Sequence, residues 1–180
     1  MTDTATIEAA KEEIEKKEGK LDILVNNAGI SGIHTEQLAS SLGQPILREV
    51  MDTNFFGLIQ TTTTFVSLLR KSNQAVILNV SSLLASLTTM ANNSWVQLAA
   101  YKASKAAVNS YTIELAHELK KDGIKVNVVN PGLIASKFNN YAAGGKSEKE
   151  GAQFLLPYAL LDGNGPTGRF FNFDGTELPW

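Results

Sequence analysis

The chain contains no cysteine, which excludes a disulfide framework, a thiolate nucleophile and any cysteine-based metal site. It has only two histidines, His34 and His117, too few for a histidine-rich cluster, so we expect no metal site. No apolar run approaches the roughly 20 residues of a membrane-spanning helix, and the polar N-terminus does not resemble a signal peptide. A net charge of −2 provides no basic surface. We therefore predict a cytoplasmic protein without nucleic-acid or membrane partners.

What the chain does contain is an alternation of short apolar runs with helical patterns. Its length predicts one domain over residues 1–180. Buried strands are predicted within residues 21–29, 75–82, 124–132 and 168–175. Apolar residues at helical spacing predict helices around residues 7–14 with a stop at Gly19, and over 46–69, about 100–121 and 153–161. Strands that are apolar along their length and alternate with helices predict an α/β fold with a parallel sheet.

Polar clusters follow three of the predicted strands. They are Asn26-Asn27-Ala28-Gly29, Ser81-Ser82 and Pro131-Gly132. Ligands of parallel α/β sheets bind beyond the carboxyl ends of the strands, so the three clusters are expected to line one crevice. The alternative is that these residues only form turns and end the strands.

The pentapeptide YKASK places Tyr101 and Lys105 four residues apart, on one face of the predicted helix. A cation close to a phenol favours the phenolate, so this spacing predicts a lowered tyrosine pKa and an acid/base role. Taken alone, the motif fits a surface helix with one exposed tyrosine equally well.

In combination and in this order, NNAG, VSS, YKASK and NPG resemble the short-chain dehydrogenase/reductase family. Residues 165–180 are similar to the C-terminal end of its carbonyl-reductase-like members. The resemblance implies NAD(P)(H)-dependent interconversion of a carbonyl and a secondary alcohol. It favours NADP(H) as the cofactor, with NAD(H) also possible.

The resemblance also implies a role for individual residues. Tyr101 would be the catalytic acid/base, Ser82 would orient the substrate oxygen, and Lys105 would hold the nicotinamide ribose. Asn54 would anchor a water in a proton relay, although it also fits an ordinary polar position in a helix. The implied cofactor-binding residues are Asn26, Asn27, Ala28, Gly29, Tyr101, Lys105, Pro131, Gly132, Ile134 and Ser136.

The substrate pocket is expected to be apolar, which fits ketones, aldehydes and alicyclic alcohols alike. Its expected walls are Leu83, Leu84, Trp95 and residues 138–141. In the family, the helices that correspond to those carrying Asn54 and Tyr101 form a dimer interface, so a homo- or heterodimer is expected there.

One departure from the family is large. The Gly-rich turn TGxxxGIG, whose backbone binds the cofactor pyrophosphate, does not occur in the sequence. About 60 residues would be missing, and the prediction is a truncated, partial doubly wound (Rossmann-type) sheet that retains family strands 4-5-6-7 with flanking helices. The strand at residues 23–26 would then be an exposed edge. The alternative to an enzyme is a catalytically impaired paralogue that acts as a structural or heterodimer partner.

Overall fold

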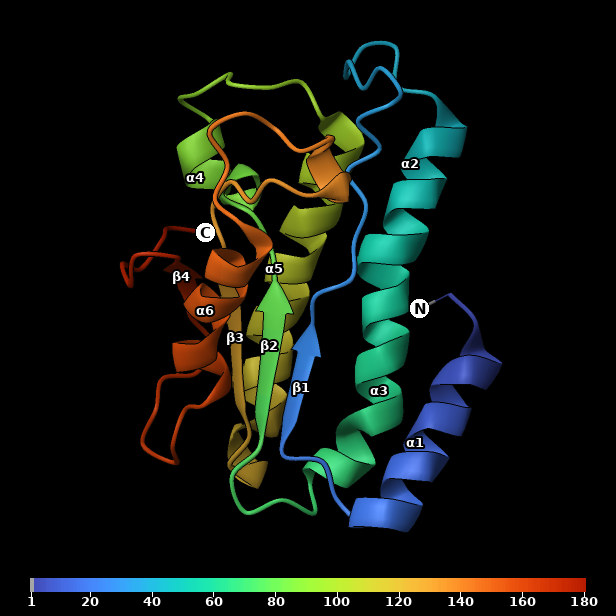
Figure 1. Cartoon of the computed structure of the whole chain (residues 1–180), viewed down its shortest axis with the longest axis vertical. Coiled ribbons are helices and arrows are strands. Elements are labelled where there is room, and N and C mark those ends of the chain that lie inside the picture. Colours follow the sequence, from blue (N-terminus) through green and yellow to red (C-terminus); the bar gives the residue numbers. More distant parts are fainter. Residues whose placement is uncertain (1) are drawn as a thin grey trace.

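A computed structural model describes residues 2–180 and contains one sheet of four parallel strands in the order β1-β2-β3-β4 (Figure 1). The strands are β1 (Ile23–Asn26), β2 (Val76–Val80), β3 (Lys125–Asn130) and β4 (Phe170–Asn172). Each lies inside one of the four apolar runs, and the order is the one expected for family strands 4-5-6-7. The predicted α/β fold with a partial doubly wound sheet is confirmed.

The helices are α1 (Thr4–Glu18), α2 (Gln44–Met51), α3 (Gly57–Leu69), α4 (Leu87–Met90), α5 (Ala99–Leu119) and α6 (Glu148–Ala159). Short 3₁₀ turns cover Leu83–Ala85, Lys120–Asp122 and Lys137–Asn139. The single helix predicted over residues 46–69 is divided, because a π-helical turn, Asp52–Phe56, lies between α2 and α3. Helix α6 begins earlier than predicted, because Ser147 and Glu150 form a capping box there. Among residues 2–180, no helix is both long and apolar enough to cross a bilayer.

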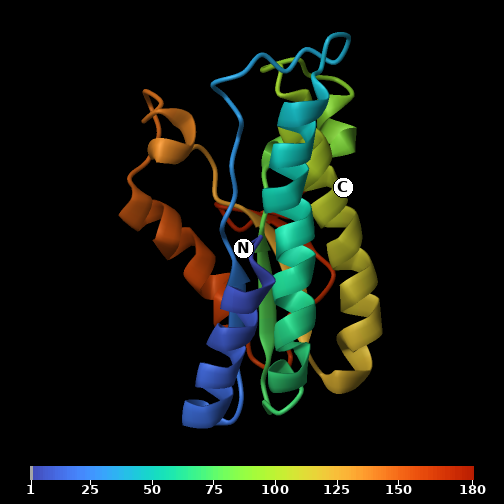
Figure 2. The same cartoon turned by 90° about the vertical axis from the view of Figure 1, so that its right-hand side faces the viewer.

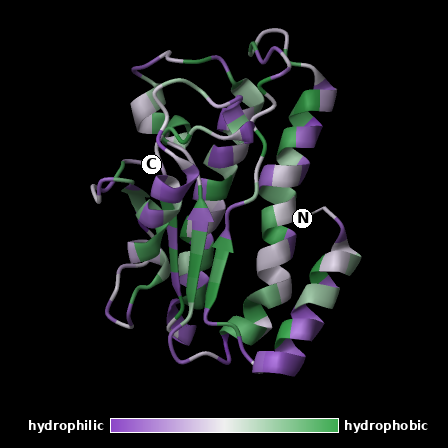
Figure 3. Cartoon of the chain, in the orientation of Figure 1, coloured by the Kyte–Doolittle hydropathy of each residue, from purple (hydrophilic) through white to green (hydrophobic). Residues whose placement is uncertain are grey.

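The helices cover the two faces of the sheet unequally. Helices α3 and α5 lie on one side, with α1 packed against α3, whereas α6 lies on the other (Figure 2). Neighbouring residues of β2 divide between these two cores, since Ile77 packs with residues of α5 and Leu78 packs with Tyr158 of α6. The strands are accordingly hydrophobic for most of their length (Figure 3). This double burial explains their continuous apolar sequences.

Strand β1 is the edge of the sheet and pairs only with β2 among the described residues. Val25, in its centre, is 38% exposed. The predicted exposed edge strand is confirmed.

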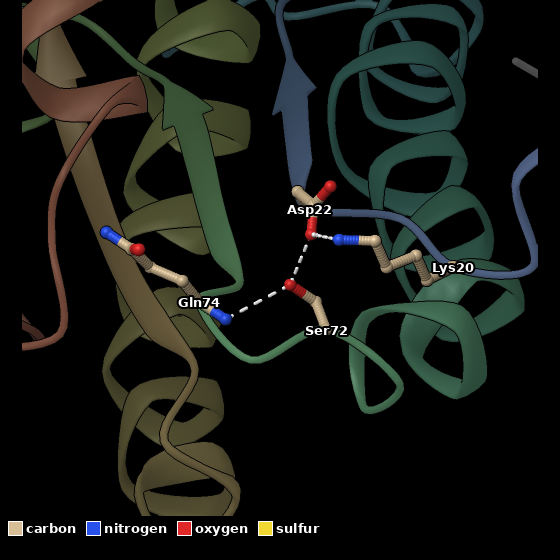
Figure 4. Close-up of polar contacts among 4 residues, drawn as sticks. All are labelled: Lys20, Asp22, Ser72 and Gln74. Atoms are coloured by element: carbon tan, nitrogen blue, oxygen red, sulfur yellow. Dashed lines mark hydrogen bonds and ion pairs between the residues drawn. The ribbon is translucent and has the colours of Figure 1, made fainter.

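A polar cluster joins the loops at the amino ends of β1 and β2 (Figure 4). The Lys20 ammonium lies 2.8 Å from the Asp22 carboxylate, which also accepts a hydrogen bond from the Ser72 hydroxyl. The Ser72 oxygen in turn accepts the backbone N–H of Gln74. These contacts hold together the loops at the amino ends of β1 and β2. The polar motifs lie at the opposite, carboxyl end of the strands.

Candidate active site

The three polar clusters meet at the carboxyl edge of the sheet. Asn26 ends β1, Ser81 and Ser82 directly follow β2, and Pro131 follows β3. Because the strands are parallel and paired in register, these ends lie at one edge, as predicted. The backbone of the NNAG turn is accessible, since Asn27 and Ala28 are exposed.

Tyr101 lies in the first turn of α5 and is only 6% exposed. Burial raises the pKa of its phenol to about 12, and a side-chain hydrogen bond with Ser82 acts in the opposite direction. The predicted lowering of the Tyr101 pKa by Lys105 is wrong for this structure. Loss of solvation dominates, and the neutral phenol is strongly favoured at neutral pH.

The Lys105 ammonium is engaged with the backbone at the end of β2. Its Nζ donates a hydrogen bond of 2.8 Å to the backbone oxygen of Val80, at the end of β2. Lys105 is 4% exposed, and burial lowers the pKa of its amine to about 8. The side chain still reaches the NNAG turn, since a Cβ added to Gly29 would lie 3.4 Å from Nζ.

The position of Ser82 fits both of its predicted roles, forming a turn and lying beside Tyr101. Its Oγ accepts the backbone N–H of Leu84 at 3.2 Å, which caps the following 3₁₀ turn. The same side chain lies close enough to the phenol to act on its pKa, which it lowers. Ser81 is buried instead, with its Oγ 3.5 Å from the backbone oxygen of Lys105. The structure therefore brings Ser82, rather than Ser81, to the phenol.

Asn54 is fully buried within the π-helical turn. Its Oδ1 accepts the N–H of Ile30 at 2.8 Å, and its Nδ2 donates to the oxygen of Ile30 at 2.9 Å and to Ser104 Oγ at 3.0 Å. One amide thus satisfies both backbone groups of the residue after Gly29. Asn54 is therefore more than an ordinary helix position, because it fixes the turn that follows β1.

Asn26 turns its side chain into the core rather than toward the crevice. Its Nδ2 donates to Thr62 Oγ1 at 2.9 Å and to Asn79 Oδ1 at 2.8 Å. Asn79 continues the network to Thr112 on α5 at 2.9 Å. Asn26 therefore supports the crevice through the strands and not by direct exposure of its amide.

The segment after β3 folds back toward Tyr101. Gly132 has φ +79°, and a Cβ there would lie 2.9 Å from the Phe173 ring. Ile134 forms an isolated bridge with Lys146. Ser136 and Asn139 form a capping box, in which the Asn139 side chain accepts the backbone N–H of Ser136. These contacts close residues 133–146 into a compact loop.

Within this loop, Phe138 contacts Tyr101 with ring centroids 5.5 Å apart. Tyr141 and Trp95, two other expected walls of the pocket, are 61% and 59% exposed. Sequence reasoning missed Ser31, Gln37 and Ser104, whose polar contacts surround Tyr101. Gln37 contacts Tyr101 across 64 residues and Ser31 contacts Phe138 across 107, so no local pattern could reveal them, whereas Ser104 bonds the backbone of Tyr101 three residues earlier.

Comparison with known proteins decides the family. A family model described as short chain dehydrogenase matches residues 1–146. The chain belongs to the short-chain dehydrogenase family. Salutaridine reductase of Papaver somniferum is 29% identical, in an alignment that covers 97% of the chain and 75% of that relative. For (+)-neomenthol dehydrogenase of Capsicum annuum the identity is 27%, over 94% of the chain and 75% of the relative.

Solved short-chain dehydrogenase structures agree with the fold. The carbonyl reductase Sniffer of D. melanogaster superimposes with a TM-score of 0.86 at 26% identity, covering 99% of this chain and 75% of the other. The carbonyl-reductase-like resemblance is therefore confirmed, and by family the chain is an oxidoreductase. It spans about three quarters of these relatives.

Proposed function

We propose that this short-chain dehydrogenase interconverts a carbonyl and a secondary alcohol with a nicotinamide cofactor, using Ser82, Tyr101, Lys105 and Asn54. The observation that carries the proposal is that Ser82 and the buried Tyr101 lie together at the carboxyl edge of the sheet, where the Ser82 side chain acts to lower the pKa of the phenol. Lys105 lies one helical turn further along α5. Two hydroxyls that lie close together at this edge can both bind a single substrate oxygen.

The protonation state of Tyr101 allows it to act as a proton donor. A phenol whose pKa lies near 12 keeps its proton at neutral pH and is a donor. In the proposed reaction Tyr101 transfers this proton to the carbonyl oxygen, while Ser82 hydrogen-bonds the same oxygen as negative charge develops on it. Lys105 and Asn54 hold the surrounding backbone, at Val80 and Ile30 respectively.

The nicotinamide half of a cofactor fits the residues around Gly29. A Cβ at Gly29 would lie 3.1 Å from Asn54 Oδ1 and 3.4 Å from Lys105 Nζ, so glycine leaves these two side chains undisplaced beside the turn. Lys105 and the backbone of Asn27 to Gly29 would hold the ribose side. The segment containing Pro131, Gly132, Ile134 and Ser136 would hold the nicotinamide and phosphate side. When bound, the cofactor supplies the hydride.

We favour NADP(H) over NAD(H). The fold is shared with an NADPH-bound carbonyl reductase from chicken fatty liver, at a TM-score of 0.83 and 24% identity. A short chain dehydrogenase from Shigella flexneri, complexed with NADP, has the same fold at a TM-score of 0.77. We also propose a cytoplasmic location and a homo- or heterodimer formed through the helices that carry Asn54 and Tyr101.

Tyr101→Phe tests the proposed chemistry. NADPH consumption is followed with a panel comprising a small ketone, an aromatic aldehyde and an alicyclic ketone. Loss of a general acid is expected to slow turnover by about a hundredfold or more. Tyr158→Phe is the matched control, because that phenol is also buried but donates to the backbone of Asn172 instead.

Turnover by Tyr101→Phe within a few-fold of the parent would refute the role of Tyr101. A parent protein that neither consumes NADPH with any member of the panel nor quenches its fluorescence would support the alternative of a structural or heterodimer partner.

A further inference from the structure

Gln37 caps the helix that carries Tyr101, from a loop 64 residues away in sequence. Its side chain is buried, and its Oε1 accepts the backbone N–H of Tyr101 at 3.2 Å. Its backbone oxygen accepts the N–H of Ala99 at 3.1 Å. The N-cap residue itself, Leu98, provides no side-chain cap. Gln37 therefore satisfies helix donors that would otherwise be unpaired at the start of α5.

The other end of the Gln37 amide holds Ser31. Gln37 Nε2 donates to the backbone oxygen of Ser31 at 2.8 Å. Ser31 is 5% exposed, and its hydroxyl donates at 2.7 Å to the backbone oxygen of Phe138. Gly32 allows this close packing, since a Cβ there would lie 2.9 Å from Gln37 Nε2. One loop thus binds both the start of α5 and the segment after β3.

Phe138 contacts Tyr101 through its ring, which connects this set of contacts back to the start of α5. The ring meets that of Tyr101 edge-on, at 64° between planes and 5.5 Å between centroids. Starting from Tyr101, hydrogen bonds run through Gln37 and Ser31 to Phe138, and an aromatic contact returns to Tyr101. The low exposure of Tyr101 is consistent with this cover.

The loop that carries Phe138 is under backbone strain in this position. Asn140 and Tyr141 both have φ +54°, a left-handed conformation that a bulky residue such as tyrosine seldom adopts. A strained segment moves away unless contacts hold it. The Ser31 hydroxyl supplies such a contact next to the strained residues.

We propose that Ser31 and Gln37 are positioning residues that hold Phe138 against Tyr101, and that Phe138 thereby favours small or planar carbonyl substrates over bulky ones. The second clause rests on the proposed function, whereas the first concerns the packing of Tyr101 alone. The two parts are therefore tested by separate measurements.

The packing is tested by nitration of the protein with tetranitromethane, followed by quantification of nitrated Tyr101 peptides by mass spectrometry. Ser31→Ala is expected to speed nitration of Tyr101 about fivefold, the change that follows from losing one ordinary hydrogen bond. Phe138→Ala is expected to speed it at least as much. Tyr158 is 8% exposed on α6 and serves as the internal control, because its nitration rate should not change.

Ser147→Ala is the matched control variant. It removes a hydroxyl hydrogen bond at the end of the same loop, to Glu150, without touching Phe138. The proposal is overturned if Ser31→Ala leaves Tyr101 nitration unchanged, if Ser147→Ala accelerates it equally, or if Tyr158 accelerates in parallel.

The role of Phe138 in specificity is tested by a double-mutant cycle. The readout is kcat/KM for a bulky polycyclic ketone relative to a small ketone. Ser31→Ala should raise this ratio about fivefold in the parent and have no effect in the Phe138→Ala background, since no ring remains to be positioned. Equal effects in both backgrounds would overturn it.

Gln37→Met separates the two positioning residues. It removes both side-chain hydrogen bonds of Gln37, so it should speed nitration of Tyr101 even when Phe138 is alanine, because it also releases the first turn of α5. A Gln37→Met protein with parental Tyr101 nitration would refute the role of Gln37. Absence of turnover in all proteins would refute the proposed function and leave the nitration result to decide the packing.

Discussion

Asn54→Ala offers a quantitative test of how the turn after β1 is held. Within residues 2–180, the substitution removes the only side chain that pairs with both the N–H and the C=O of Ile30, and it also removes a donor to Ser104. Each unpaired backbone group costs about 1–3 kcal/mol, with the lower part of this range appropriate for the half-buried Ile30. Alanine returns about 0.5 kcal/mol through its higher helix propensity. The free energy of unfolding should fall by about 2–3 kcal/mol.

Asn109→Ala is the control, since Asn109 is also a buried helical asparagine. It is 4% exposed, but neither its Nδ2 nor its Oδ1 has a partner within residues 2–180. Its removal breaks no hydrogen bond to the protein and improves helix propensity. The free energy of unfolding should therefore stay within about 1 kcal/mol of the parent.

Urea unfolding followed by circular dichroism measures both variants. With a slope of about 2 kcal/mol per molar urea, the Asn54→Ala midpoint should fall by about 1–1.5 M, and the Asn109→Ala midpoint should move by less than about 0.5 M. An Asn54→Ala midpoint close to that of the parent would refute the reasoning. So would an equal loss in the two variants, because burial rather than hydrogen bonding would then explain the cost.

Two further predictions concern Lys105 and the dimer. The pKa of Lys105 is near 8 in the folded protein and 10.5 in the unfolded chain, so the unfolded chain binds more protons between these two pH values. The free energy of unfolding should therefore rise with pH from 8 to 10. Relative to Lys105→Met, the rise over this range is about 2 kcal/mol in urea unfolding, and a flat difference would contradict it. Phe56 is 55% exposed on the π-helical turn, and Phe56→Ser should shift the proposed dimer toward monomer in sedimentation velocity. A parent that sediments as a monomer at high concentration would contradict the dimer.

The strands could be predicted from the sequence because β2 and β3 are buried on two faces, and even the partly exposed β1 is apolar from Ile23 to Val25. The position of the polar motifs could also be predicted, because a parallel strand order fixes which strand ends lie together. The start of α6 could also have been predicted, because Ser147 and Glu150 spell a capping box. Only the apolar part of that helix was recognised.

Other features depend on contacts that no local pattern contains. The π-helical turn accompanies the pairing of Asn54 with Ile30, 24 residues earlier. The pKa of Tyr101 depends on its burial, which raises it, and on the Ser82 side chain, which lowers it. The YKASK spacing correctly placed both residues on one helix. It could not show that solvation would outweigh the charge.

The asparagine pair between β1 and β2 has a consequence for the register of these two strands. Asn26 and Asn79 are direct register partners, and their amides hydrogen-bond within a buried polar network that includes Thr62 and Thr112. Sliding β1 along β2 by one residue would part them and turn the Asn26 amide to the opposite face of the sheet. Such a slip is costly, because apolar side chains alone tolerate it far better than buried amides. The core therefore sets the height of the NNAG turn relative to the phenol above it.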